Sequence, residues 1–260
     1  MSMPALFISH GSPMLAIEDS SARRFLLQLG KTLPRPKAII VASAHWETTG
    51  SVEVSLAAHP ETIHDFGGFP EVLFDIQYPA KGAPGTAART AELLQQAGIA
   101  VASSANRGLD HGAWVPLRLM YPDADIPTAQ ISLRHGAAPA EHEQIGKALR
   151  TLRDDGVLII GSGSLTHNLY AYRGASLDAA VPSWVSDFGD WMHTRLQANQ
   201  RDSLLDYRAQ APFAVRNHPT EEHLLPLFVA MGAAGDAPLA ERLHASYEYG
   251  VLAMDMYALS

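Results

Sequence analysis

Four short segments of the chain each hold a histidine in surroundings that suit a metal ion. They span residues 9–13, 43–46, 161–168 and 219–223. Three of the four follow closely on an apolar run that is typical of a buried strand. Neutral imidazole is the commonest protein ligand of divalent transition metals. Because open α/β sheets bind ligands at the carboxyl ends of their strands, we expect these histidines to meet at one metal site.

The first two histidines stand at the ends of predicted strands. His10 follows the apolar run 5–8, and the turn after it would let His10 and Ser12 face a cavity. His45 follows the run 38–42 in the same way, and its neighbour Trp46 could form an aromatic wall of a pocket. Each histidine alone could simply be a polar group that ends a strand. Together they indicate ligands of a shared site.

The other two segments offer further candidates. Glycines and serines at 161–164 precede His167, and such small residues let the backbone approach a ligand closely. Their spacing fits neither common phosphate-binding loop, so we expect His167 to be a metal ligand or an acid or base. His223 follows Glu221 and Glu222 at the expected start of a helix, with Thr220 as its N-cap. Glutamates are ordinary in a first helical turn, whereas a histidine gains nothing from the helix dipole there and is predicted to bind metal.

Two more histidines lie in segments rich in glycine and aromatic residues. His111 is followed by Gly112 and Trp114, and it could bond to, or stack on, a flat substrate. His64 lies in the segment 63–70, which carries two phenylalanines and two glycines and could close over an aromatic ligand. Both could equally be ordinary loop histidines. The six remaining histidines lack such surroundings and are not expected to bind metal.

The composition restricts both the metal and the partners. The 260-residue chain has no cysteine, so histidine, aspartate, glutamate or water must hold the metal, which suits Fe(II), Zn(II), Mn or Ni. A net charge of -8 and the lack of a basic cluster disfavour nucleic acid and anionic membranes as partners. The sequence shows no signal peptide and no apolar stretch of about 20 residues, which favours a cytoplasmic protein.

Apolar runs of strand length alternate with helical patterns along the chain. Strands are predicted at 5–8, 38–42, 52–56, 99–102, 127–133 and 157–160, and helices at 20–33, 84–96, 138–155, 183–198 and 221–231. The last helix is the least regular, because Pro226 lies inside it. This alternation predicts an α/β fold in which helices flank a central, mostly parallel or mixed sheet. We expect residues 1–260 to form a single catalytic domain, with the metal site at the carboxyl ends of the strands.

Taken together, these motifs resemble the extradiol DOPA 4,5-dioxygenase family, a branch of the class III extradiol ring-cleavage dioxygenases. That branch is related to the catalytic subunit of protocatechuate 4,5-dioxygenase. The resemblance rests on residues 10–13, 43–46, 62–70, 110–114, 161–168 and 219–223 and runs nearly from end to end of the chain. It implies a mononuclear non-haem metal site, with Fe(II) for activity and Zn(II) as another metal that such a site binds.

The resemblance also implies roles for individual residues, carried over by their positions in the motifs. It implies three metal ligands, namely His10, His45 and His223. His167 matches the acid/base histidine and could also reach the metal, and His111 matches a second catalytic histidine near the substrate. The protocatechuate branch uses a glutamate as its third ligand, so Glu222 is the alternative to His223.

The implied function is that of a dioxygenase that opens the ring of a DOPA-like catechol with O2 and yields a muconic semialdehyde. We expect Ser12, Trp46, His64 and Trp114 to bind the substrate. Two alternatives stay open: a zinc-dependent hydrolase with a metal-bound water, and a metal-binding interaction module of the same fold without catalytic activity. The chain is expected to act as a monomer or a small homo-oligomer.

Overall fold

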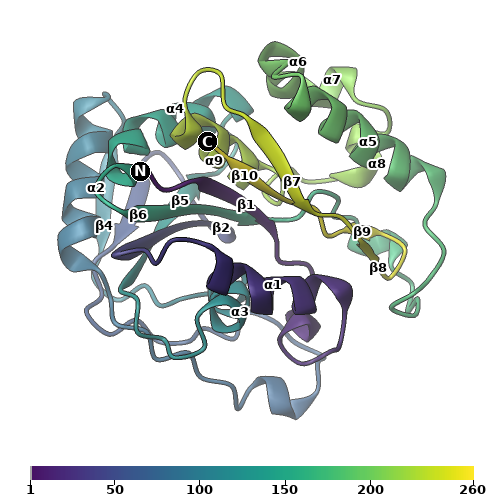
Figure 1. Cartoon of the computed structure of the whole chain (residues 1–260), viewed down its shortest axis with the longest axis horizontal. Coiled ribbons are helices and arrows are strands. Elements are labelled where there is room, and N and C mark those ends of the chain that lie inside the picture. Colours follow the sequence, from purple (N-terminus) through teal and green to yellow (C-terminus); the bar gives the residue numbers. More distant parts are fainter. Residues whose placement is uncertain (1) are drawn as a thin grey trace.

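An eight-stranded mixed sheet forms the centre of the molecule, with helices on both of its faces (Figure 1). The computed structural model describes residues 2–260. In spatial order the strands are β4 (Val101–Ser104), β3 (Val52–Ser55), β5 (Thr128–Arg134), β2 (Ala38–Thr48), β6 (Val157–Gly163), β1 (Ala5–Ser9), β10 (Met256–Leu259) and β7 (Ala240–His244). The central strands β5, β2, β6 and β1 run parallel, whereas β10 and β7 are antiparallel additions at one edge. The predicted α/β fold with a mixed sheet is confirmed.

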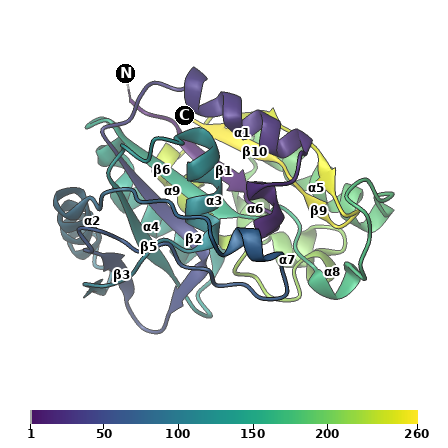
Figure 2. The ribbon, with the colours of Figure 1, turned by 90° about the horizontal axis from the view of Figure 1, so that it is seen from below.

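Alternate residues of the central strands face opposite sides of the sheet, which produces two hydrophobic cores. Phe7 of β1 belongs to the core covered by α2 (Pro84–Gln96), α4 (Pro139–Leu149), α5 (Ser183–Gln197) and α9 (Leu225–Ala234). Its neighbour Leu6 belongs to the second core, which is covered by α1 (Ser21–Thr32) and α3 (His111–Met120). Figure 2 looks onto this second face. The parallel strands are therefore buried on both sides, which explains why they read as continuous apolar runs.

The remaining elements are short. Three helices connect α5 to α9, namely α6 (Arg201–Leu205), α7 (Tyr207–Gln210) and α8 (Ala214–Asn217). Strands β8 (Tyr247–Glu248) and β9 (Leu252–Ala253) pair with each other between β7 and β10. Within residues 2–260, no helix combines the length and the apolar character that crossing a membrane requires.

The helix predicted at 221–231 begins later than expected. It starts at Leu225, so Pro226 occupies the first turn, where its missing N–H has no partner to lose. Thr220 is therefore not the N-cap, and its hydroxyl instead donates to the Glu222 carboxylate at 3.0 Å. His223 lies in the turn that precedes the helix rather than in its first turn.

Other boundaries also differ from the sequence prediction. Strand β2 does not end at residue 42 but continues through His45 to Thr48. His111 is not in a loop, because Asp110 accepts from the Ala113 N–H and caps a helix that begins at His111. The helix predicted at 138–155 ends at Leu149 and continues as a short 3-10 turn. The strands from β7 to β10 were not predicted from the sequence.

Candidate metal centre

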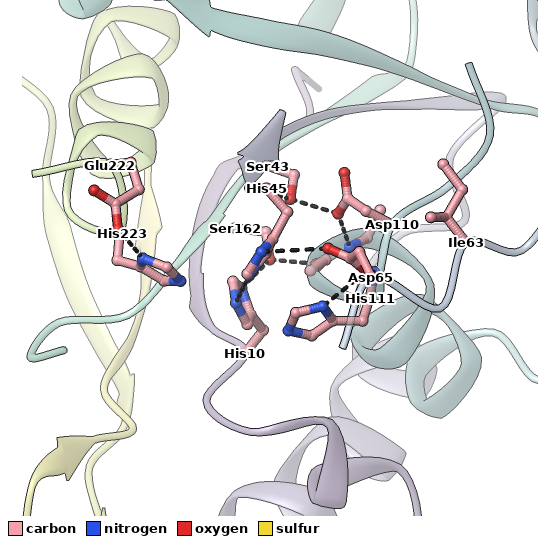
Figure 3. A network of polar contacts seen from close by, with 12 residues as sticks. His10, Ser43, His45, Ile63, Asp65, Asp110, His111, Ser162, Glu222 and His223 are labelled. Atoms are coloured by element: carbon pink, nitrogen blue, oxygen red, sulfur yellow. Dashed lines mark hydrogen bonds and ion pairs between the residues drawn. The ribbon is translucent and has the colours of Figure 1, made fainter. Parts of the chain in front are cut away.

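Five histidines from separate segments meet at the carboxyl ends of the central parallel strands, and Figure 3 labels four of them. They are His10 after β1, His45 within β2, His111 at the start of α3, His167 after β6 and His223 just before α9. The convergence predicted for His10, His45, His167 and His223 is therefore present in the fold.

Local backbone features aim two of these side chains. Strand β1 ends at Ser9, and the turn behind His10 uses Gly11 at a φ of 58°, a conformation that glycine adopts easily. The register between β2 and β5 shifts between Ala42 and Glu47, so that His45 lies in an irregular stretch of the strand. Such irregularities commonly re-aim a side chain next to a functional site.

Three of the imidazoles form a candidate ligand set. One ring nitrogen from each of His10, His45 and His223 lies within 4.8 Å of the other two. The Nε2 atoms of His10 and His45 are 3.0 Å apart. Nitrogen ligands lie about 2.1 Å from a zinc ion. Two nitrogens bound to the same ion are therefore separated by a distance close to the 3.0 Å between these Nε2 atoms.

The opposite nitrogens of His10 and His45 point to oxygen atoms of the protein. His10 Nδ1 is 3.0 Å from the Ser162 hydroxyl. That hydroxyl donates its own hydrogen to the Gly112 carbonyl, so it accepts from His10. His45 Nδ1 lies 3.3 Å from Oδ2 of Asp65. The His10 ring therefore keeps a lone pair on Nε2. The nearby carboxylate of Asp65 favours the hydrogen of His45 on Nδ1, which leaves a lone pair on its Nε2 as well.

In His223, too, one ring nitrogen faces a protein oxygen. Its Nδ1 donates to Oε1 of Glu222 at 2.8 Å, which leaves Nε2 free (Figure 3). Histidines that bind metal usually donate their other N–H to a carboxylate, a carbonyl or a water molecule in this way. Glu222 thus has the geometry of a partner of His223 rather than of a competing ligand.

Burial keeps the candidate ligands neutral. It is the main cause that lowers the pKa of His10 and His223 well below the ordinary value, and neighbouring histidines lower both further. Burial, followed by the charge of His111, lowers the pKa of His45 to about 4. When both rings carry their hydrogen on Nδ1, the two Nε2 lone pairs face each other at 3.0 Å, and a cation between them removes their repulsion. The residues present therefore fit a divalent metal ion.

His167 lies directly against the candidate ligand set. Its ring stacks on that of His223, with centroids 3.4 Å apart and planes inclined by 9°. Nitrogen atoms of both rings and a carboxylate oxygen of Glu222 also form a possible metal-binding group. Burial lowers the pKa of His167 to about 4. The ring is consequently neutral at pH 7 and can accept a proton.

Asp65 is a member of the site that sequence reasoning did not single out. Its Oδ1 accepts from the backbone N–H of His111 at 3.0 Å and from Nδ1 of His111 at 2.9 Å. Burial raises the pKa of the Asp65 carboxyl, but the interactions with His111 outweigh this and hold the pKa well below its ordinary value. The only sequence signal was its position beside His64 in a glycine-rich segment.

Three of the four predicted substrate contacts already make a hydrogen bond within the protein. Trp114 is fully buried and donates from Nε1 to the Ile63 carbonyl, so it supports the wall from behind instead of facing a substrate. His64 Nε2 is 2.9 Å from the carbonyl of Ile76. The Ser12 hydroxyl accepts from the Met14 N–H.

Trp46 is only 7% exposed, and the guanidinium of Arg107 lies 5.0 Å from its ring centroid. Direct contact with a substrate therefore stays a prediction for Ser12, Trp46 and His64.

Glycine at position 112 allows the rings to approach one another. A Cβ atom there would lie 2.5 Å from the Ser43 hydroxyl, 3.0 Å from the His45 ring and 3.1 Å from the His10 ring. Any larger residue would push the imidazoles apart. The glycine after His111 is therefore a packing requirement of the site.

The fold and this site place the chain in a known class of enzymes. Residues 4–257 match the family described as the catalytic LigB subunit of aromatic ring-opening dioxygenase, and the chain belongs to this family. The resemblance inferred from the motifs is confirmed.

Individual relatives are similar over almost the whole chain. A protein of Beta vulgaris named 4,5-DOPA dioxygenase extradiol is 44% identical over 255 residues, which cover 96% of this chain and 94% of the relative. An Escherichia coli (strain K12) protein of the same name is 42% identical over 234 residues, which cover 89% of this chain and 85% of the relative. The crystal structure of an uncharacterized Escherichia coli K12 protein matches with a TM-score of 0.81 and 34% identity, covering 99% of this chain and 100% of that one.

Proposed function

We propose that this protein is an extradiol dioxygenase that opens the ring of a DOPA-like catechol with O2 to give a muconic semialdehyde. The observation that carries the proposal is the convergence of three imidazoles, two of them buried and that of His45 half-buried, each with one nitrogen turned toward a protein oxygen. It occurs in a chain that shares 44% identity with a 4,5-DOPA dioxygenase extradiol.

We assign the metal to His10, His45 and His223. Fe(II) is the metal proposed for activity, and Zn(II) is expected to occupy the same three nitrogens. When bound, the metal would hold the catechol oxygens and O2 beside each other and carry electron density between them. Glu222 is assigned as the hydrogen-bond acceptor that orients His223.

His167 is the proposed acid/base group. Its neutral ring lies against His223, so a catechol bound at the metal would have one hydroxyl beside it. A ring nitrogen of His167 accepts the proton of that hydroxyl as the substrate binds. The resulting imidazolium is more acidic than that of an ordinary histidine, since the folded protein lowers its pKa, and it returns the proton later in the reaction.

His111 is proposed to contact the substrate from the other side of the cluster. Because Nδ1 donates to Asp65, its Nε2 is an acceptor that can hold the second catechol hydroxyl. The ring centroid of His111 lies 5.3 Å from that of His10 and 3.9 Å from that of His45, so it borders the proposed metal position.

The test is an oxygen-consumption assay. Metal-free protein is reconstituted with Fe(II) without oxygen, and L-DOPA or other catechols are then added with O2. The proposal predicts uptake of one O2 for each catechol and a yellow semialdehyde product. A zinc-dependent hydrolase would consume no oxygen and would cleave ester or amide substrates with Zn(II) instead. Absence of oxygen uptake across a catechol panel would refute the proposed function.

A further inference from the structure

The Asp65 carboxylate lies between two histidines of the cluster and uses a different oxygen for each. Oδ1 accepts both the backbone N–H and the Nδ1–H of His111, at 3.0 and 2.9 Å. Oδ2 lies 3.3 Å from Nδ1 of His45. A single carboxylate therefore joins a candidate ligand to the candidate substrate-binding histidine (Figure 3).

The segment that carries Asp65 is fixed on both sides. The Ile63 N–H donates to the Leu109 carbonyl at 2.8 Å, and the Ile63 carbonyl accepts from Trp114 Nε1 at 3.0 Å. On the other side, the ring of Phe66 packs edge-on against the His111 ring, with centroids 5.6 Å apart. These contacts hold the carboxylate in place relative to the start of α3.

We propose that Asp65 is a positioning residue that selects the tautomer of both His45 and His111. An ionised carboxylate only accepts hydrogen bonds, so Nδ1 of each ring must carry the hydrogen. Nε2 of His45 then keeps its lone pair for the metal, and Nε2 of His111 keeps its lone pair for a substrate hydroxyl. This inference rests on the proposed function, because it takes His45 as a ligand.

The substitution Asp65→Asn separates this role from a merely structural one. The side chain keeps its size, and its single carbonyl oxygen can still accept both hydrogens from His111. Its amide N–H then faces Nδ1 of His45 and forces the hydrogen of that ring onto Nε2. The wrong tautomer cannot bind metal through Nε2, just as the wrong tautomer disables histidine when an aspartate partner is replaced by asparagine in serine proteases.

The affinity for Zn(II), measured by competition with a chelator, is the first readout. Loss of an outer partner of a ligating histidine typically weakens metal binding by about 10–100-fold. We expect a loss of that size for Asp65→Asn and a smaller one for Asp65→Glu, which restores the carboxylate. Asp75→Asn is the matched control, because it removes the same charge from an exposed position of the same connection between β3 and α2. Zn(II) affinity of the control should equal that of the wild type.

Nitrogen-15 spectra of the histidine rings in the metal-free protein provide a second readout that needs neither metal nor activity. They should show hydrogen on Nδ1 of His45 in the wild type and on Nε2 in Asp65→Asn. If Asp65→Asn binds Zn(II) like the wild type and keeps the same tautomer, the inference is wrong while the proposed function stands. If the wild type itself fails to bind Zn(II), the proposed function fails and this inference fails with it.

Discussion

At the residue scale, the oxygen atoms beside the histidine nitrogens are better evidence for a metal site than the number of histidines is. Each of His10, His45 and His223 turns one nitrogen toward a protein oxygen and leaves the other free inside the cluster. An isolated buried histidine would be satisfied by one such bond at each nitrogen. Three nitrogens that face one another in this way are typical of the ligands of a single metal ion.

The first prediction separates the two candidates for the third ligand. His223→Ala should abolish stoichiometric metal binding, because it removes a nitrogen of the set. Glu222→Ala should retain the metal with an affinity about 10–100-fold weaker, since it removes only the acceptor that orients His223. Metal analysis of the two purified variants checks this. The reverse pattern would make Glu222 the ligand.

The second prediction concerns the acid/base assignment. His167→Ala should bind metal but lose activity by about 100-fold or more, because the proton of the catechol hydroxyl has lost its acceptor. Steady-state rates measured on protein of known metal content check the prediction. Normal turnover of catechols by this variant would show that another group moves the proton.

At the element scale, close contact between β6 and the segment before α9 places His223. A Cβ atom at Gly163 would lie 2.0 Å from the carbonyl oxygen of His223, and one at Gly161 would lie 2.0 Å from that of Pro226. Glycines at the end of β6 are therefore needed for packing. The sequence led us to relate them to a bound ligand, but the structure shows them against the backbone of the neighbouring segment.

The third prediction follows from this contact. Gly163→Ala should lower the free energy of unfolding by about 1–3 kcal/mol and weaken metal binding, because the backbone of His223 must move away. Gly85→Ala is the control, since nothing lies within 4 Å of a Cβ atom there and the residue is helical. Urea unfolding of the metal-free variants measures the stability, and competition with a chelator measures the Zn(II) affinity. Equal stability and equal Zn(II) affinity of the two variants would contradict the argument.

The elements also show how far the sequence alone could predict the site. Strand ends that carry His10 and His167 were predictable, because buried parallel strands give continuous apolar runs. The irregular register that aims His45 was not, since it depends on pairing between β2 and β5. Asp65 escaped notice for a similar reason: its partner His111 is distant in the sequence, and only the tertiary fold brings the two together.

At the scale of the whole molecule, burying so many histidines makes the metal-free protein sensitive to acid. The pKa values of His45, His167 and His218 are each lowered to about 4, mainly by burial. In the unfolded chain these side chains take up protons below about pH 6.5. Between about pH 6.5 and pH 4 the unfolded state therefore binds more protons than the folded state, so the free energy of unfolding decreases as the pH falls.

The fourth prediction quantifies this dependence. The free energy of unfolding of the metal-free protein should fall between pH 6.5 and 4 by about 1.4 kcal/mol per pH unit for each such histidine. His167→Gln should reduce the slope, whereas His59→Gln, at an exposed position, should leave it unchanged. Urea titrations at several pH values measure the slope. A stability that does not change over this range would contradict the assigned burial effects.

The most direct test of the account is anomalous diffraction from crystals of the protein loaded with Zn(II) or, without oxygen, with Fe(II). We predict a single metal peak bound by Nε2 of His10, His45 and His223, with Glu222 and Asp65 hydrogen-bonded to their histidines. A peak bound by Glu222 and His167 or by Asp65 and His111, without His10, would contradict the assignment of His10, His45 and His223 as the ligands.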